Sequence, residues 1–133
     1  MKSCMTLVEQ AEKEITTLSV EEALALNEAG QVVMVDVRDV RELYREGRVP
    51  GAVHAPRGML EFWIDPASPY HREVFASGEY FVFYCSLGWR SALEAHTAQS
   101  MGLQPVAHVG GGLEAWRQAG GPVEAVNRRP PRA

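Results

Sequence analysis

One of the two cysteines in this 133-residue chain lies where nucleophilic chemistry is favoured. Cys85 follows the apolar run YFVFY (80–84), and a short loop and an alanine-rich stretch come directly after it. Gly88 lets the loop take turns that other residues avoid, so several backbone N–H groups can point at one centre. A helix starting at Ser91 adds its partial positive charge, and Arg90 adds a permanent charge. Together these features favour a reactive thiolate over the alternative of a small buried residue that ends a strand.

Strands that alternate with helices position this loop. The unbroken apolar runs 32–36 and 80–84 predict parallel strands covered on both faces. Shorter strands are predicted at ITTLS (15–19), around Val53 and His54, and at PVAHV (105–109). Helices are predicted over the first dozen residues, from the Ser19–Glu22 capping box to Gly30, and over 39–47, 58–64, 68–78, 91–101 and 113–120. The pattern predicts one α/β domain, with Cys85 at the carboxyl edge of a parallel sheet, where ligands bind.

Composition and spacing argue against several classes of partner. The net charge of −4, with no basic patch interleaved with aromatic residues, gives no reason to expect nucleic acid. No apolar run approaches the roughly 20 residues that span a bilayer, and the N-terminus lacks the apolar run of a signal peptide. The two cysteines and four histidines show no disulfide or metal-ligand spacing, and the glycines at 110–112 do not match a dinucleotide fingerprint. We therefore expect a cytoplasmic protein with no membrane partner, no metal and no cofactor.

Three motifs resemble those of the rhodanese-like family. CSLGWRS (85–91) resembles the active-site loop C-x-x-G-x-R-S, VDVRDVRELYREGRVPGAVHAP (35–56) the upstream motif, and GLQPVAHVGGGLEAWRQAGGPV (102–123) the closing motif. The resemblance implies a three-layer fold with a five-stranded parallel sheet flanked by helices, over residues 15–124. An N-terminal helix (1–14) is expected to pack on this domain, and residues 125–133 to form a loose polar tail. The chain departs from the pattern at Arg48 and Val49, where His-Ile is usual, and in the long aromatic segment 57–78.

The resemblance implies a sulfurtransferase. Cys85 would take sulfane sulfur from a small anionic donor such as thiosulfate as a persulfide, and would pass it to cyanide, a thiol or a protein acceptor. Backbone N–H groups of the loop would stabilise the persulfide charge. Two interpretations of Arg90 stay open: a clamp for the donor, or a salt bridge that only fixes the loop. The substrate-binding residues implied in this way are Ser86, Leu87, Gly88, Trp89, Arg90 and Ser91.

Other polar residues near strand ends are candidates for the rim of the pocket. Asp36 ends one strand and Arg57 follows another that ends at the same sheet edge, although a scaffold role for Asp36 and a solvated surface position for Arg57 are the alternatives. Arg38 and Glu42 are four residues apart and are predicted to pair on a helical turn. Three aromatic residues are predicted to form the core of the 57–78 segment, with lining of the entrance as the alternative: Phe62, Trp63 and Tyr70. Trp89 is expected to form a pocket wall or to pack on residues 60–63.

Two other functions stay open. Rhodanese-like folds resemble certain cell-cycle phosphatases, which also use a cysteine, an anion-binding loop and an arginine, so a phosphatase or arsenate reductase is one alternative. Those enzymes need five residues between cysteine and arginine, whereas four separate Cys85 from Arg90, which favours a single sulfur atom over a phosphate. A non-enzymatic sulfur carrier or protein-binding module is the other alternative, because it would need the same Cys85 and loop. Cys4 is interpreted as an ordinary residue of the first helix rather than a resolving thiol.

Overall fold

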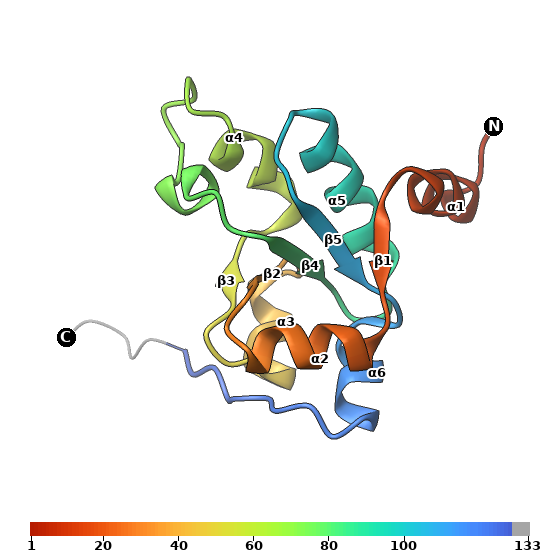
Figure 1. The fold of residues 1–133 in the computed structure, drawn as a ribbon, viewed down its shortest axis with the longest axis vertical. Helices are drawn as coiled ribbons and strands as arrows, with labels where there is room; N and C mark the ends of the chain where they lie inside the picture. The colour runs from red at the N-terminus through yellow and green to blue at the C-terminus, as the bar shows by residue number, and fades with distance from the viewer. Residues whose placement is uncertain (129–133) are drawn as a thin grey trace.

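A five-stranded parallel sheet forms the centre of the protein in the computed structural model, which describes residues 1–128 (Figure 1). The strand order is β1-β5-β4-β2-β3, and every pairing is parallel. The strands are β1 (Thr16–Leu18), β2 (Val33–Asp36), β3 (Val53–His54), β4 (Phe81–Tyr84) and β5 (Val106–Val109). All five strands lie where the sequence predicts them, and β4 is the central strand.

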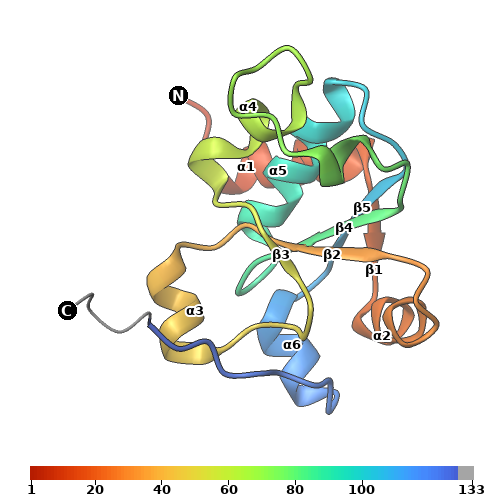
Figure 2. The ribbon, with the colours of Figure 1, turned by 90° about the vertical axis from the view of Figure 1, so that its left-hand side faces the viewer.

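Helices cover both faces of the sheet (Figure 2). The α-helices of the described residues are α1 (Cys4–Glu14), α2 (Val20–Glu28), α3 (Val40–Glu46), α4 (Leu60–Ile64), α5 (Trp89–Ser100) and α6 (Gly112–Gln118). Figure 2 shows α1, α4 and α5 on one face of the sheet and α2, α3 and α6 on the other. The protein is therefore a three-layer α/β fold with a parallel sheet, as predicted.

Alternating side chains of β4 hold the two helical layers together. Phe81 and Phe83 pack on the α4 and α5 side, whereas Val82 and Tyr84 pack on the α2 and α6 side. All four side chains are at most 1% exposed. Burying a side chain of this size contributes about 2–3 kcal/mol each. The residue that follows β4 is consequently held by packing on both faces.

The connection between β3 and β4 differs from the prediction. No helix begins at Ser68: the residues around it form a turn, in which the Ser68 hydroxyl accepts the N–H of Tyr70. The segment instead contains 3₁₀-helices at Arg57–Met59 and Glu73–Ala76.

The predicted aromatic core of this segment is wrong for two of its three residues. Phe62 and Tyr70 are 52% and 60% exposed. Trp63 is partly buried, and the Arg72 guanidinium lies 4.3 Å from its ring centroid.

The chain after α6 returns to the motif at residues 35–56 and pairs with it at Arg48. Arg48 and Glu124 pair through an antiparallel bridge, and Arg48 Nε lies 2.8 Å from Glu124 Oε1. The predicted loose tail over 125–133 falls partly on residues 129–133, which lie outside the described residues. No helix within residues 1–128 is both long and apolar enough to cross a membrane.

Candidate active site

Cys85 stands directly after β4, at the carboxyl edge of the sheet. Its Sγ accepts backbone N–H groups from Gly88 at 3.2 Å and from Ser91 at 3.4 Å, and the residue is only 1% exposed. Gly88 precedes α5 with a φ of +95°, a conformation that a residue with a side chain rarely adopts. The loop therefore turns its N–H donors, together with the N-terminus of α5, toward one sulfur atom.

The closing glycine turn holds this loop from the other side. The N–H groups of Leu113 and Glu114, at the start of α6, donate to the carbonyls of Cys85 and Ser86 at 2.8 and 3.2 Å. Gly112 has a φ of +62°, and a Cβ there would lie 2.5 Å from the Cys85 carbonyl oxygen. These two bonds hold the start of the loop in place, and the N–H groups of Gly88 and Ser91 farther along it point to Sγ. The sequence excludes a dinucleotide fingerprint at the glycines 110–112 but does not predict this contact with the loop.

Arg90 forms an ion pair beside the sulfur. Its Nη1 lies 3.1 Å from Glu42 Oε2, and its Nη2 donates to Ser86 Oγ at 3.3 Å. Glu42 thus pairs with Arg90, and the predicted pair with Arg38 is wrong. The permanent charge of Arg90 is shared with a carboxylate before any substrate binds.

Arg38 is instead used inside the protein. It is fully buried, and its Nη2 lies 2.7 Å from both the Asp36 Oδ2 carboxylate and the Gly47 carbonyl. Asp36 is also fully buried and aligns with Tyr84 across the β2–β4 pair. Burial raises the pKa of the Tyr84 phenol, and the nearby Asp36 carboxylate adds to the effect. Asp36 therefore belongs to a buried polar cluster, the scaffold alternative, and not to a solvent-exposed rim.

A cavity of about 200 Å³ opens at Cys85 and is lined by Cys85, Ser86, Leu87, Trp89 and Arg90. Trp89 and Leu87 are 51% and 44% exposed, so the cavity has apolar side chains at its solvent-accessible part. The predicted loop residues therefore gather at one site: Gly88 and Ser91 contact Sγ, and the others line the cavity.

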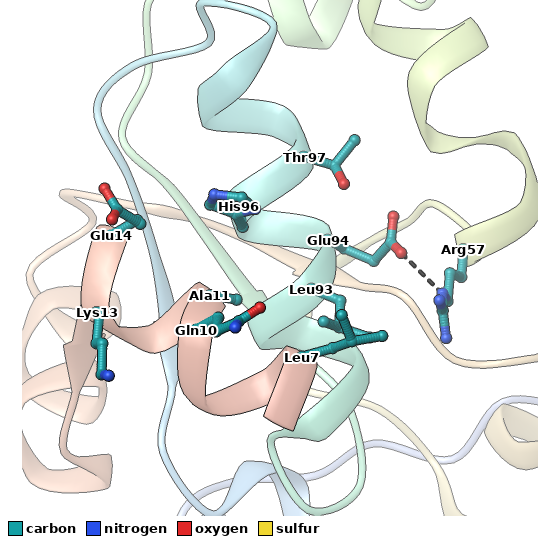
Figure 3. Close-up of a pocket in the computed structure, with 10 residues that line it drawn as sticks. All are labelled: Leu7, Gln10, Ala11, Lys13, Glu14, Arg57, Leu93, Glu94, His96 and Thr97. Atoms are coloured by element: carbon teal, nitrogen blue, oxygen red, sulfur yellow. Dashed lines mark hydrogen bonds and ion pairs between the residues drawn. The ribbon is translucent and has the colours of Figure 1, made fainter. Parts of the chain in front are cut away.

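Arg57 lines a different depression. A groove of about 630 Å³ lies between α1 and α5. Figure 3 shows its lining residues, with Arg57 at one end. Arg57 Nε lies 2.8 Å from Glu94 Oε1, and burial raises the pKa of the Glu94 carboxyl while Arg57 opposes that rise. Neither Arg57 nor Asp36 lines the cavity at Cys85.

His108 is the residue that sequence reasoning missed. It lies in β5, is 1% exposed, and its Nδ1 is 3.0 Å from Ser91 Oγ. Its Nε2 is 3.0 Å from Thr17 Oγ1 in β1. Burial lowers the pKa of His108 to about 4, so the imidazole is neutral at pH 7. The available signal was a lone histidine within the apolar strand VAHV, next to the strand that ends at Cys85.

Within residues 1–128, no group of three or more histidine, cysteine, aspartate or glutamate side chains could hold a metal ion.

The site consists of a buried sulfur, backbone donors, a hydroxyl, a neutral imidazole and a paired guanidinium. Such a set suits an anionic sulfur nucleophile and its anionic adducts.

Comparison with known proteins agrees with the motifs. Residues 19–119 match the model of the Rhodanese-like domain, and the chain therefore belongs to the rhodanese-like family. It is 26% identical over 100 residues to mouse thiosulfate sulfurtransferase/rhodanese-like domain-containing protein 3, covering 71% of this chain and 64% of the mouse protein. The chain spans 54% to 64% of the length of the two curated relatives that it matches.

Solved structures repeat the fold. A thiosulfate sulfurtransferase from Pseudomonas aeruginosa superposes with a TM-score of 0.75 at 25% identity, covering 95% of this chain and 23% of that one. A Rhodopseudomonas palustris protein of unknown function, described as a possible tyrosine phosphatase, gives a TM-score of 0.91 at 52% identity, covering 93% of this chain and 96% of that one. The family model and the solved structures therefore agree on the rhodanese-like fold.

Proposed function

We propose that the protein is a sulfurtransferase that carries sulfane sulfur as a persulfide on Cys85. The observation that carries the proposal is the pair of backbone N–H groups, from Gly88 and Ser91, that converge on Sγ at the floor of a small cavity. Fixed donors of this kind stabilise a charged sulfur without reorganising during the reaction. Membership of the rhodanese-like family supports the same reaction class.

The proposed reaction has two balanced steps. The Cys85 thiolate attacks the outer sulfur of thiosulfate; a new S–S bond forms, the old one breaks, and sulfite leaves with its electron pair. The charge that was on Sγ then resides on the terminal sulfur of the persulfide. Cyanide or a thiolate attacks that terminal sulfur, and the Cys85 thiolate leaves, which restores the starting state. No net proton is transferred in either step when the acceptor is an anion.

The N–H groups of Gly88 and Ser91 stabilise the charge on the Cys85 thiolate before and after each transfer. Arg90 shares its charge with Glu42, so its pull on a donor is weaker than that of a free guanidinium. The bonds from α6 to the Cys85 and Ser86 carbonyls hold the loop and its N–H donors in place. We therefore infer that the loop recognises one charged sulfur atom closely, and that the remainder of a small anionic donor lies toward Trp89 and Arg90.

Intact-mass spectrometry after incubation with thiosulfate tests the persulfide directly. The expected result is a mass gain of one sulfur atom, its loss on addition of cyanide, and thiocyanate in the supernatant. Cys85→Ser should abolish all three signals. Cys4→Ser is the matched control, since Cys4 is the other cysteine of the chain and is exposed on α1. Absence of the adduct in the wild-type protein with several sulfane donors would refute the persulfide mechanism.

The same experiment separates the competing functions. A sulfur carrier would gain the sulfur atom on Cys85 but would not release it to cyanide or small thiols, only to a protein acceptor. A phosphatase would hydrolyse aryl phosphates at a rate comparable to sulfur transfer, an outcome worth testing because the Rhodopseudomonas palustris structure is described as a possible tyrosine phosphatase. Four residues between Cys85 and Arg90 argue against it. A reactive free thiol also fits the cytoplasm, a reducing compartment, as the proposed location.

A further inference from the structure

A line of polar side chains runs from Cys85 toward Glu12, and hydrogen bonds join its members as far as Thr17. Ser91 Oγ lies 3.6 Å from Cys85 Sγ and 3.0 Å from His108 Nδ1. His108 Nε2 lies 3.0 Å from Thr17 Oγ1 and 3.6 Å from Glu12 Oε2. Cys85, Ser91 and His108 are at most 1% exposed, whereas the Glu12 side chain is 41% exposed. The line therefore leads from the buried sulfur to a side chain that reaches solvent.

Each inner member of this line has a partner in either of two arrangements. With the thiol, S–H donates to Ser91, the Ser91 hydroxyl donates to Nδ1, and Nε2–H points to Thr17 and Glu12. With the thiolate, the directions reverse: the Thr17 hydroxyl donates to Nε2, Nδ1–H donates to Ser91, and the Ser91 hydroxyl donates to Sγ. A hydroxyl and a neutral imidazole can each donate and accept, so neither buried group loses a bond in either arrangement.

We propose that Ser91 and His108 form a proton relay that carries the Cys85 thiol proton to the Glu12 end and then holds the Ser91 hydroxyl against the thiolate. The thiol proton moves to Ser91 Oγ, the Ser91 proton to Nδ1, and the Nε2 proton to the Glu12 carboxylate, from which it enters solvent. One proton leaves, Sγ keeps the electron pair of its S–H bond, and His108 stays neutral with its proton on the other nitrogen. His108 acts on the sulfur through Ser91 and is a positioning residue.

The surroundings of His108 suit this role. Burial lowers its pKa to about 4, so at pH 7 one ring nitrogen carries a proton and the other accepts one. Within the described residues, the charged group that lies near the ring is Glu12 from α1. The other polar neighbours of the ring are Thr17 from β1 and Ser91 from α5, and Cys85 lies beyond Ser91. Glu12 and Thr17 precede residues 19–119, which match the family model. The outer end of the relay is therefore supplied by the N-terminal helix and first strand of this chain.

The relay has a direct signature in the tautomer of His108. Nitrogen-detected NMR of the imidazole, with the Cys4→Ser protein, is expected to show the proton on Nε2 below the pH at which Cys85 ionises and on Nδ1 above it. Ser91→Ala should abolish this switch, because the hydroxyl that connects ring and sulfur is gone. The same tautomer on both sides of the Cys85 ionisation in the Cys4→Ser protein would overturn the proposal.

Alkylation by iodoacetamide supplies an independent measure of the thiolate. In the Cys4→Ser background, Ser91→Ala and His108→Leu are expected to raise the midpoint of the rate–pH profile by about one pH unit, a tenfold loss of thiolate below it, since a donor to a charged group is lost. Thr17→Val should shift it in the same direction by a smaller amount, and Thr16→Val, on the same strand, should not. If His108→Leu does not fold, Ser91→Ala and Thr17→Val still test the relay. An unchanged midpoint of the alkylation rate–pH profile in both variants would overturn it.

This inference rests on Cys85 being the reactive thiol of the proposed function, yet the two can fail separately. A tautomer switch without a sulfur adduct would retain the relay and refute the sulfurtransferase. A sulfur adduct on Cys85, with no tautomer switch at His108 and unchanged alkylation midpoints in the variants, would retain the sulfurtransferase and refute the relay.

Discussion

Gly112→Ala tests whether the contact between α6 and the Cys85 loop shapes the active site. The residue has a φ of +62°, so alanine would incur about 1–2 kcal/mol of backbone strain. Its Cβ would also lie 2.5 Å from the Cys85 carbonyl oxygen and 2.6 Å from the carbonyl carbon of Ser86. Relieving that clash means moving the loop, at a further cost of about 1–3 kcal/mol. At about 4 °C per kcal/mol for a chain of this size, we expect Tm to fall by about 8–20 °C.

Gly120→Ala is the matched control. Gly120 has a similar φ of +81°, but no heavy atom lies within 4 Å of a Cβ placed there. It should lose only the backbone strain, about 4–8 °C in Tm, and keep its sulfur transfer. Gly112→Ala should also lower the rate of thiocyanate formation by about 10- to 100-fold, because displaced N–H donors no longer converge on Sγ. Equal Tm values and equal rates for the two variants would refute this account of the loop.

Three further predictions concern charged and titrating side chains. Glu42→Gln should release Arg90 toward the donor and lower the KM for thiosulfate several-fold with little change in kcat; an unchanged or raised KM would show that Arg90 only fixes the loop. The pKa of His108 in the folded protein, about 4, lies below its ordinary value, so between pH 6.5 and pH 4 the unfolded chain binds a proton that the folded protein does not. The free energy of unfolding should therefore fall by about 3 kcal/mol over this range, and denaturant unfolding of His108→Asn should show a smaller fall. Arg57→Gln leaves the Glu94 carboxylate buried without its partner, so the free energy of unfolding should fall by about 1–3 kcal/mol at pH 7 and recover in part on acidification. A large loss of sulfur-transfer rate in a variant that stays folded would instead place Arg57 at the active site.

Local and pattern-based features were the predictable part of the fold. The apolar runs that became β2 and β4, and the Ser19–Glu22 capping box, depend on residues close in sequence, and the structure contains all of them. The segment 57–78 was not predictable in the same way. Ser68 closes a turn instead of capping a helix, and Phe62 and Tyr70 stay exposed, because composition alone does not say which face of an irregular segment meets the core.

Pairing between distant charged residues was also beyond the sequence. A spacing of four suggested that Arg38 pairs with Glu42, but Arg38 turns inward to Asp36, and Glu42 crosses to Arg90. Helical spacing identifies neighbours on one helix and carries no information on partners from another element. Asp36 and Arg57 follow neighbouring strands, yet one is buried and the other lines a separate groove.

The sequence by itself determined the family, the parallel sheet and the position of Cys85 after its central strand, because motif order and hydrophobic pattern are properties of the chain read in one dimension. The tertiary structure decided what surrounds the sulfur. Register between β1 and β5 brings Thr17 to His108, and packing of α5 on the sheet brings Ser91 between His108 and Cys85. Residues 17, 91 and 108 are distant along the chain, so only the folded sheet and its helices could show that they form one connected line.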